Sequence, residues 1–114
     1  MKSFSNNYGL SERDTQTLFG IFNRFQEVEN VYLYGSRAKN THKLGSDIDL
    51  AIMNEGVSEK TVRNIKAEIE DSNLPYFVDI TNFTTLNHKE LAEHIQRVGI
   101  SFYNKNKQNF VFSN

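Results

Sequence analysis

The residues with the clearest capacity for chemistry in this chain are a glycine–serine pair and three aspartates. They are Gly35-Ser36, then Asp47 and Asp49 after ten intervening residues, and Asp79 further along the chain. A hydroxyl beside a glycine turn can bind a phosphate group, and closely spaced carboxylates can bind divalent cations. Together these residue types predict that the substrate is a nucleoside triphosphate and that the reaction is nucleotidyl transfer.

Asp47 and Asp49 give the stronger signal, because they lie in the segment 47–53, which otherwise has the pattern of a β-strand. Residues two apart on a strand project from the same face, with Cα atoms roughly 6.5–7 Å apart. Two carboxylates about 6 Å apart repel by roughly 3 kcal/mol at an effective dielectric near 20. Two interpretations stay open: a hard cation such as Mg²⁺ or Mn²⁺ offsets this repulsion, or the pair forms a solvated strand edge that resists aggregation.

Asp79 repeats this pattern, since it interrupts an apolar run in the segment 76–82. If the strands 47–53 and 76–82 are neighbours, the three acids converge on one face. Three acids can bind two metal ions, which clamp a triphosphate and activate an attacking hydroxyl. Asp79 can also accept the proton of that hydroxyl. The alternative is an aspartate that is hydrogen-bonded at the end of a strand.

Gly35 and Ser36 follow a predicted strand at 31–34 and precede a short helical turn at 36–39. Glycine allows the backbone to approach a ligand closely, and the start of a helix offers free N–H groups to an anion. Taken alone, the dipeptide is common and is usually only a turn. Arg37 comes next, and its guanidinium could reach phosphate oxygens or a partner protein.

Histidine and tyrosine are not expected to take part in the chemistry. The three histidines have no metal-ligand spacing, and His94 is expected on the face of a helix. Tyr32 and Tyr34 are expected to be core or edge aromatics rather than acceptors. No serine–histidine–aspartate nucleophile system can be assembled from this sequence.

Helices and strands are expected to alternate along the chain. Apolar residues recur at helical spacing after Ser11, Ser58 and Asn87, three polar residues that can cap helix N-termini. These helices are expected to end at Glu29-Asn30, at residues 71–73 and at Gly99, and the strands to be 31–34, 47–53, 76–82 and 100–103. This order predicts an α/β or α+β fold, a small mixed sheet of three to four strands with helices packed on one face.

Composition limits the class of protein. With 114 residues the chain is expected to form a single domain over 1–114, with flexible tails at 1–10 and 104–114. The absence of cysteine excludes disulfides and thiolate metal sites. A formal charge of −1 argues against a protein that binds long nucleic acid. No segment resembles a signal peptide or a membrane span, so a cytoplasmic protein is expected.

The motif 33–38 (Leu-Tyr-Gly-Ser-Arg-Ala), followed at this spacing by 46–52 (Ser-Asp-Ile-Asp-Leu-Ala-Ile), resembles the DNA polymerase β nucleotidyltransferase superfamily. More narrowly, it resembles the minimal nucleotidyltransferases (MNT) of bacteria and archaea. The run 77–80 matches the place of that family's third acid, and the resemblance covers roughly residues 15–103. One departure is Asn40, where many relatives have glycine, and it puts the shape of this loop in question.

This resemblance implies a polymerase β-type fold and the transfer of a nucleoside monophosphate from ATP, with Mg²⁺ (two ions), to a hydroxyl group. Gly35 and Ser36 would bind the β- and γ-phosphates. Asp47 and Asp49 would ligate both metal ions, and Asp79 would complete the site.

The resemblance also implies a partner. Minimal members are commonly paired with a HEPN-domain protein, a ribonuclease toxin, and act as antitoxins by attaching AMP to a tyrosine of that partner. A protein adenylyltransferase in a hetero-oligomer with such a toxin is therefore the first hypothesis. The second is a non-catalytic subunit that neutralises by binding, with Phe110 and Phe112 in its interface. The third is a small-molecule nucleotidyltransferase of the aminoglycoside-modifying kind.

Overall fold

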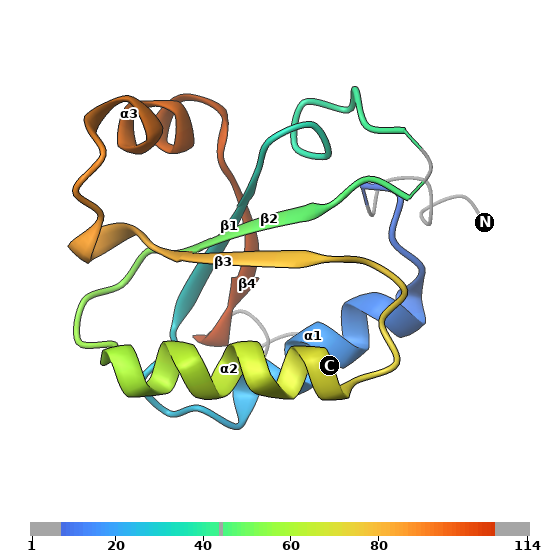
Figure 1. Cartoon of the computed structure of the whole chain (residues 1–114), viewed down its shortest axis with the longest axis horizontal. Helices are drawn as coiled ribbons and strands as arrows, with labels where there is room; N and C mark the ends of the chain where they lie inside the picture. The colour runs from blue at the N-terminus through green and yellow to red at the C-terminus, as the bar shows by residue number, and fades with distance from the viewer. Residues whose placement is uncertain (1–7, 44, 107–114) are drawn as a thin grey trace.

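The computed structural model describes residues 8–43 and 45–106, and within them it contains three α-helices and a four-stranded sheet (Figure 1). In chain order the elements are α1 (Glu12–Asn23), β1 (Asn30–Tyr34), β2 (Ile48–Ile52), α2 (Glu59–Asp71), β3 (Val78–Asn82), the 3₁₀ helix η2 (Phe83–Thr85), α3 (Lys89–Val98) and β4 (Ile100–Asn104). The order and type of the predicted helices and strands are confirmed.

The sheet has the strand order β3-β2-β1-β4, in which β2 and β3 are parallel and β1 is antiparallel to both β2 and β4. The predicted mixed sheet is therefore confirmed, with four strands. Its register places Tyr34 opposite Asp49, and Asp49 opposite Asp79. One row across three strands thus carries two of the three candidate acids.

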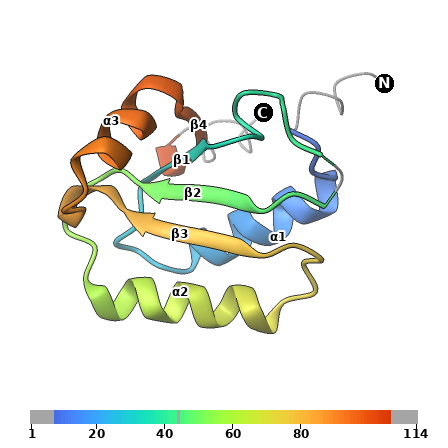
Figure 2. The same ribbon diagram turned by 45° about the horizontal axis from the view of Figure 1, so that its top comes forward.

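Helices α1 and α2 cover one face of this sheet and enclose the main hydrophobic core (Figures 1 and 2). The strands contribute alternate residues to it, and the helices contribute their apolar stripes: Leu18, Ile21, Phe22, Val31, Leu33, Ile48, Leu50, Ile52, Ile65 and Ile69. Full burial of one such side chain stabilises the fold by about 1.5–3 kcal/mol. Because the apolar members of β2 must face this core, the residues between them face the other way.

Helix α3 lies on the opposite face, which corrects the expectation that helices pack on one face alone (Figure 2). Its residue Ile95 is buried against Tyr34 and Ala51. The small side chain of Ala51 leaves room for a helix at this place. Gly99 ends α3 as predicted, and a side chain there would overlap with the carbonyl of Ile95.

The helix caps follow the sequence with one exception. Ser11 and Ser58 accept hydrogen bonds from backbone N–H groups three residues on, at 3.0 and 3.1 Å, as predicted. At α3 the cap is His88 rather than Asn87, because the Nδ1 atom of His88 accepts the N–H of Leu91 at 3.1 Å. Helix α1 is also shorter than expected, since the apolar pattern continues through turns after residue 24.

Residues 8–10 belong to the packed domain, although the sequence placed them in a flexible tail. Leu10 is only 3% exposed, and Tyr8 packs against the core. Residues 1–7 and 107–114, with Phe110 and Phe112, lie outside the described residues. In the described part of the chain, no helix has both the length and the apolar character needed to cross a bilayer.

Candidate active site

The structure brings Asp49 and Asp79 together on the face of the sheet that carries α3. They are paired across the parallel strands β2 and β3. Asp47 lies just before β2, and its side chain is exposed at the rim. Ile48 and Leu50, both fully buried, anchor β2 to the core and so turn Asp49 outward.

The acids share one electrostatic field, as the pKa of Asp49 shows. Partial burial raises this pKa above its ordinary value, and the charges of Asp79 and Asp47 raise it further. Arg37 and His94 act in the opposite direction but do not cancel the effect. A site that disfavours its own carboxylate charge in this way is suited to a cation.

Gly35 brings the predicted phosphate-binding turn next to these aspartates. Its φ of 79° lies in the left-handed region, and a Cβ atom at this position would overlap with the carboxylate of Asp49. Glycine is therefore required here by the aspartate as well as by the turn. The sequence predicted the turn, but the contact with Asp49 depends on the pairing of β1 with β2.

Ser36 lies in a short helical turn, as the sequence indicated. The N–H of Lys39 donates to the carbonyl of Gly35 at 3.1 Å, and the N–H of Thr41 donates to the carbonyl of Ser36 at 2.9 Å. Asn40 follows with a φ of 61°. Asparagine is one of the residues that tolerate the left-handed conformation, so Asn40 is compatible with the turn that the sequence put in question.

Arg37, which the sequence offered as a residue that could reach phosphate oxygens, is buried, and its guanidinium is bound to backbone carbonyls. Its side chain is 2% exposed, and its guanidinium is 4.8 Å from the ring centroid of Tyr76. It donates to the carbonyls of Tyr8 and Ser46, each at 2.8 Å, and to that of Asp47 at 3.3 Å. Arg37 therefore fixes the end of the loop that presents Asp47.

Tyr34 and His94 are residues of the site that the sequence did not indicate. Tyr34 is 6% exposed, and its hydroxyl donates to Asp79 Oδ2 at 3.4 Å and lies 3.3 Å from Thr81 Oγ1. Burial raises the pKa of Tyr34, and the charges of Asp79 and Asp49 add to this. Its ring contacts His94 of α3 edge-on, at 6.3 Å between centroids. Tyr34 lies within the motif 33–38, but only the register of the sheet and the docking of α3 bring Tyr34 and His94 to the acids.

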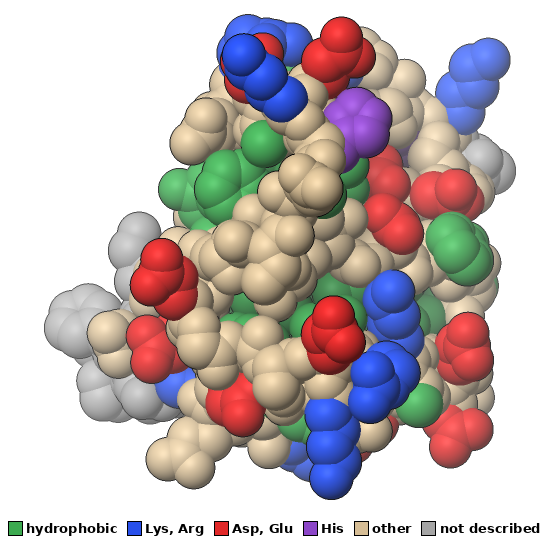
Figure 3. Space-filling model, turned by 60° about the vertical axis from the view of Figure 1, so that its left-hand side comes forward, with side chains coloured by type: hydrophobic (Ala, Val, Ile, Leu, Met, Phe, Trp, Pro, Cys, Tyr) green, Lys and Arg blue, Asp and Glu red, His purple; other side chains and the backbone are tan. Residues whose placement is uncertain are grey.

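The donor set fits a hard divalent cation. Asp47, Asp49 and Asp79 offer carboxylate oxygens, the ligands that Mg²⁺ prefers. Over residues 8–43 and 45–106, no three acidic or histidine side chains already form a metal-binding group. Binding would thus require the exposed Asp47 side chain to turn toward the other two. Figure 3 shows acidic side chains gathered beside a histidine, and a separate band of basic side chains on the same face.

Comparison with known proteins shows the family of this chain. The family model described as "Polymerase beta, Nucleotidyltransferase" matches residues 16–108. The chain therefore belongs to the polymerase β nucleotidyltransferase family. Among curated proteins it is similar to the probable protein adenylyltransferase MntA of Haemophilus influenzae, with 33% identity over 78 residues, which covers 68% of each chain.

Solved structures share the fold. A toxin–antitoxin structure with AMP-PNP has a TM-score of 0.65 at 16% identity, over 87% of this chain and 80% of the other. The MNT antitoxin in complex with a tri-AMPylated HEPN toxin of Shewanella oneidensis has a TM-score of 0.61 at 14% identity, over 89% and 78%. A putative nucleotidyltransferase of Sulfolobus solfataricus has a TM-score of 0.58 at 17% identity, over 90% and 87%.

Proposed function

We propose that this chain is a metal-dependent protein adenylyltransferase that acts as an antitoxin, transferring AMP from ATP to a tyrosine hydroxyl of a HEPN-domain partner. The observation that carries the proposal is the contact of the Gly35 turn with Asp49, which is itself paired with Asp79. A phosphate-binding turn and a cation site in contact are what nucleotidyl transfer requires. Because all three acids are present, the proposal favours a catalytic antitoxin over one that only binds.

In this proposal Gly35 and Ser36 hold the terminal phosphates of ATP. Asp47, Asp49 and Asp79 would hold Mg²⁺, which supplies charge neutralisation on the phosphates and a lower pKa for the attacking hydroxyl. Asp79 accepts the tyrosine proton. The tyrosine oxygen then forms a bond to the α-phosphorus, the bond from that phosphorus to the bridging oxygen breaks, and diphosphate leaves.

Known relatives support the partner and the nucleotide. The curated relative carries the name of a protein adenylyltransferase, and solved structures with this fold include one with AMP-PNP and one with a tri-AMPylated HEPN toxin. We extend these properties to this chain as part of the proposal. Use of ATP would place the protein in the cytoplasm, where ATP is supplied.

The test is AMP transfer between purified proteins. The chain is incubated with the partner that the proposal requires, a HEPN-domain protein from the same genome, together with ATP and Mg²⁺, and the intact mass of the partner is measured. We expect additions of whole AMP units on tyrosine, and none with the double variant Asp49→Asn/Asp79→Asn. A partner that keeps its unmodified mass, while wild-type protein binds ATP, would reject the proposal.

A further inference from the structure

The surface beside Asp79 has features that the transfer of AMP from ATP does not by itself explain. Strand β3 is an edge strand, with β2 on one side and no strand on the other among the described residues. Phe77 comes just before β3 and is 67% exposed, and it is the one exposed large hydrophobic side chain found in the described residues. An exposed aromatic beside an open sheet edge is typical of a binding surface.

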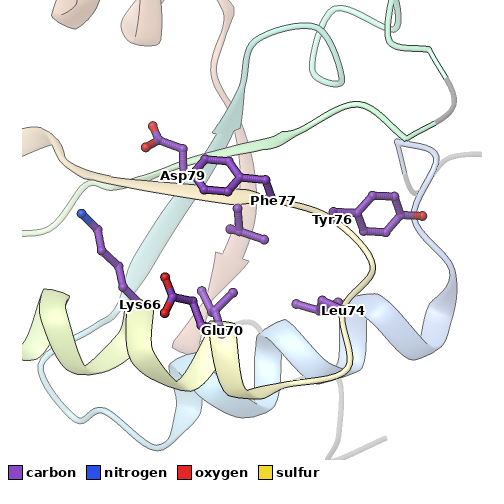
Figure 4. A pocket seen from close by; sticks show the side chains of 8 residues that line it. Lys66, Glu70, Leu74, Tyr76, Phe77 and Asp79 are labelled. Carbon is purple, nitrogen blue, oxygen red and sulfur yellow. The ribbon is translucent and has the colours of Figure 1, made fainter.

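A hollow of about 230 Å³ adjoins this edge, between α2 and the start of β3. Figure 4 shows Lys66 and Glu70 reaching from α2 toward the strand, with Asp79 on β3 and Phe77 just before it. Apolar side chains complete the wall: Ile69, Leu74, Tyr76 and Val78. Asp79 is also among the residues that line the hollow, so the hollow adjoins the edge strand that carries this acid of the candidate active site.

The geometry of the transfer determines the side of the aspartates from which the acceptor approaches. The sheet order sets the phosphate turn at the end of β1, Asp49 in the centre on β2, and Asp79 on β3. In nucleotidyl transfer the attacking and leaving oxygens lie in line on opposite sides of the phosphorus. With the leaving diphosphate at Ser36, the acceptor must arrive from the side of β3.

We propose that the hollow and Phe77 form the docking surface for the acceptor, an extended polypeptide segment of the partner in which the modified residue stands beside an apolar side chain. This rests on the proposed function. The backbone of the segment runs along the open edge of β3 and exchanges hydrogen bonds with it. Its apolar side chain packs on Phe77 and in the hollow, which places the adjacent hydroxyl at Asp79.

The charges of the surface fit a polypeptide. Lys66 and Glu70 lie one helical turn apart on α2 and offer one cation and one anion. A polypeptide segment that carries both acidic and basic side chains can pair with each of these two charges. A nucleic acid would instead bring its phosphates against Glu70 and Asp79, where they are repelled.

Crosslinking tests the placement without relying on turnover. Phe77 is replaced by p-benzoylphenylalanine, a phenylalanine that carries a photoreactive group, and a HEPN-domain protein from the same genome is added with ATP and Mg²⁺. Ser101, an exposed residue on the opposite edge strand β4, carries the same group as a control. We expect the crosslink from position 77 to fall within a few residues of the tyrosine that receives AMP. Crosslinks from position 101 alone would overturn the inference.

Kinetics give a second, independent measurement. Phe77→Asp should lower kcat/KM for the partner by about 10-fold or more, mainly through a higher KM, and Phe77→Ala should have a smaller effect in the same direction. Ser101→Asp, which adds the same charge on the other edge, should change it less than 2-fold, a rough limit for a site outside the interface. Equal kcat/KM in wild type and Phe77→Asp would reject the docking surface alone. No AMP on the partner from the wild-type protein would reject the proposed function and this inference together.

Discussion

Substitution of Gly35 by alanine tests two features of this turn, its left-handed conformation and its contact with Asp49. Gly35 has a φ of 79°, and an alanine there is strained by about 1–2 kcal/mol. Its Cβ would also overlap with the carboxylate of Asp49, so Asp49 must move. For a domain of about 100 residues, a loss of 1 kcal/mol lowers the Tm by roughly 4–8 °C. Misplacement of a reacting group by about 1 Å can cost about 100-fold in rate.

The matched control is Gly56→Ala. Gly56 has a φ of 90°, in the same left-handed region, and no atom lies within 4 Å of a Cβ built there. Both variants should therefore lose stability through the same backbone strain, as measured by thermal denaturation followed by circular dichroism. Only Gly35→Ala should lose AMP transfer, by about 100-fold. Full transfer activity in Gly35→Ala, or an equal loss in Gly56→Ala, would refute the argument.

Three further predictions concern the acids and the residues that surround them. Asp49→Asn should raise the Tm relative to wild type in EDTA, and the difference should grow as the pH rises above 3.8, because an acid with a raised pKa destabilises the fold once it is ionised. Arg37→Ala should lower the free energy of unfolding in urea by on the order of 3 kcal/mol, because buried carbonyls lose their donor. Arg37→Lys should recover only part of this lost free energy. Tyr34→Phe should lower kcat more than it changes KM for ATP, because the hydroxyl that donates to Asp79 is lost.

Each of these has an outcome that contradicts it. A constant difference in Tm between Asp49→Asn and wild type at all pH values would show that ionisation of Asp49 does not destabilise the fold. If Arg37 bound phosphate, Arg37→Ala would weaken ATP binding and leave stability unchanged. A higher KM for ATP with an unchanged kcat in Tyr34→Phe would place that hydroxyl on the nucleotide and not on Asp79.

The sequence was sufficient to predict features that depend on local periodicity. Ile48 and Leu50 alternate with Asp49, and this pattern alone placed the acid on the face away from the core. Ser11 and Ser58 likewise act on backbone groups only three residues away. Such short-range rules need no knowledge of how distant segments pair.

What the sequence could not show depends on contacts between distant segments. The burial of Arg37 requires Tyr8 and Tyr76, which lie far from it along the chain. The contact of Gly35 with Asp49 requires the antiparallel pairing of β1 and β2. Helix α3 could be predicted from its apolar stripe, but that stripe does not say which face of the sheet it covers.

The central claim is that Asp47, Asp49 and Asp79 bind the cation that serves a triphosphate held at Ser36. A crystal structure of the chain with Mg²⁺ and a non-hydrolysable ATP analogue tests this most directly. We expect a cation bound by oxygens of Asp49 and Asp79, with Asp47 turned toward it, and the terminal phosphates at Ser36. An analogue bound elsewhere, with no cation at these aspartates, would contradict the claim.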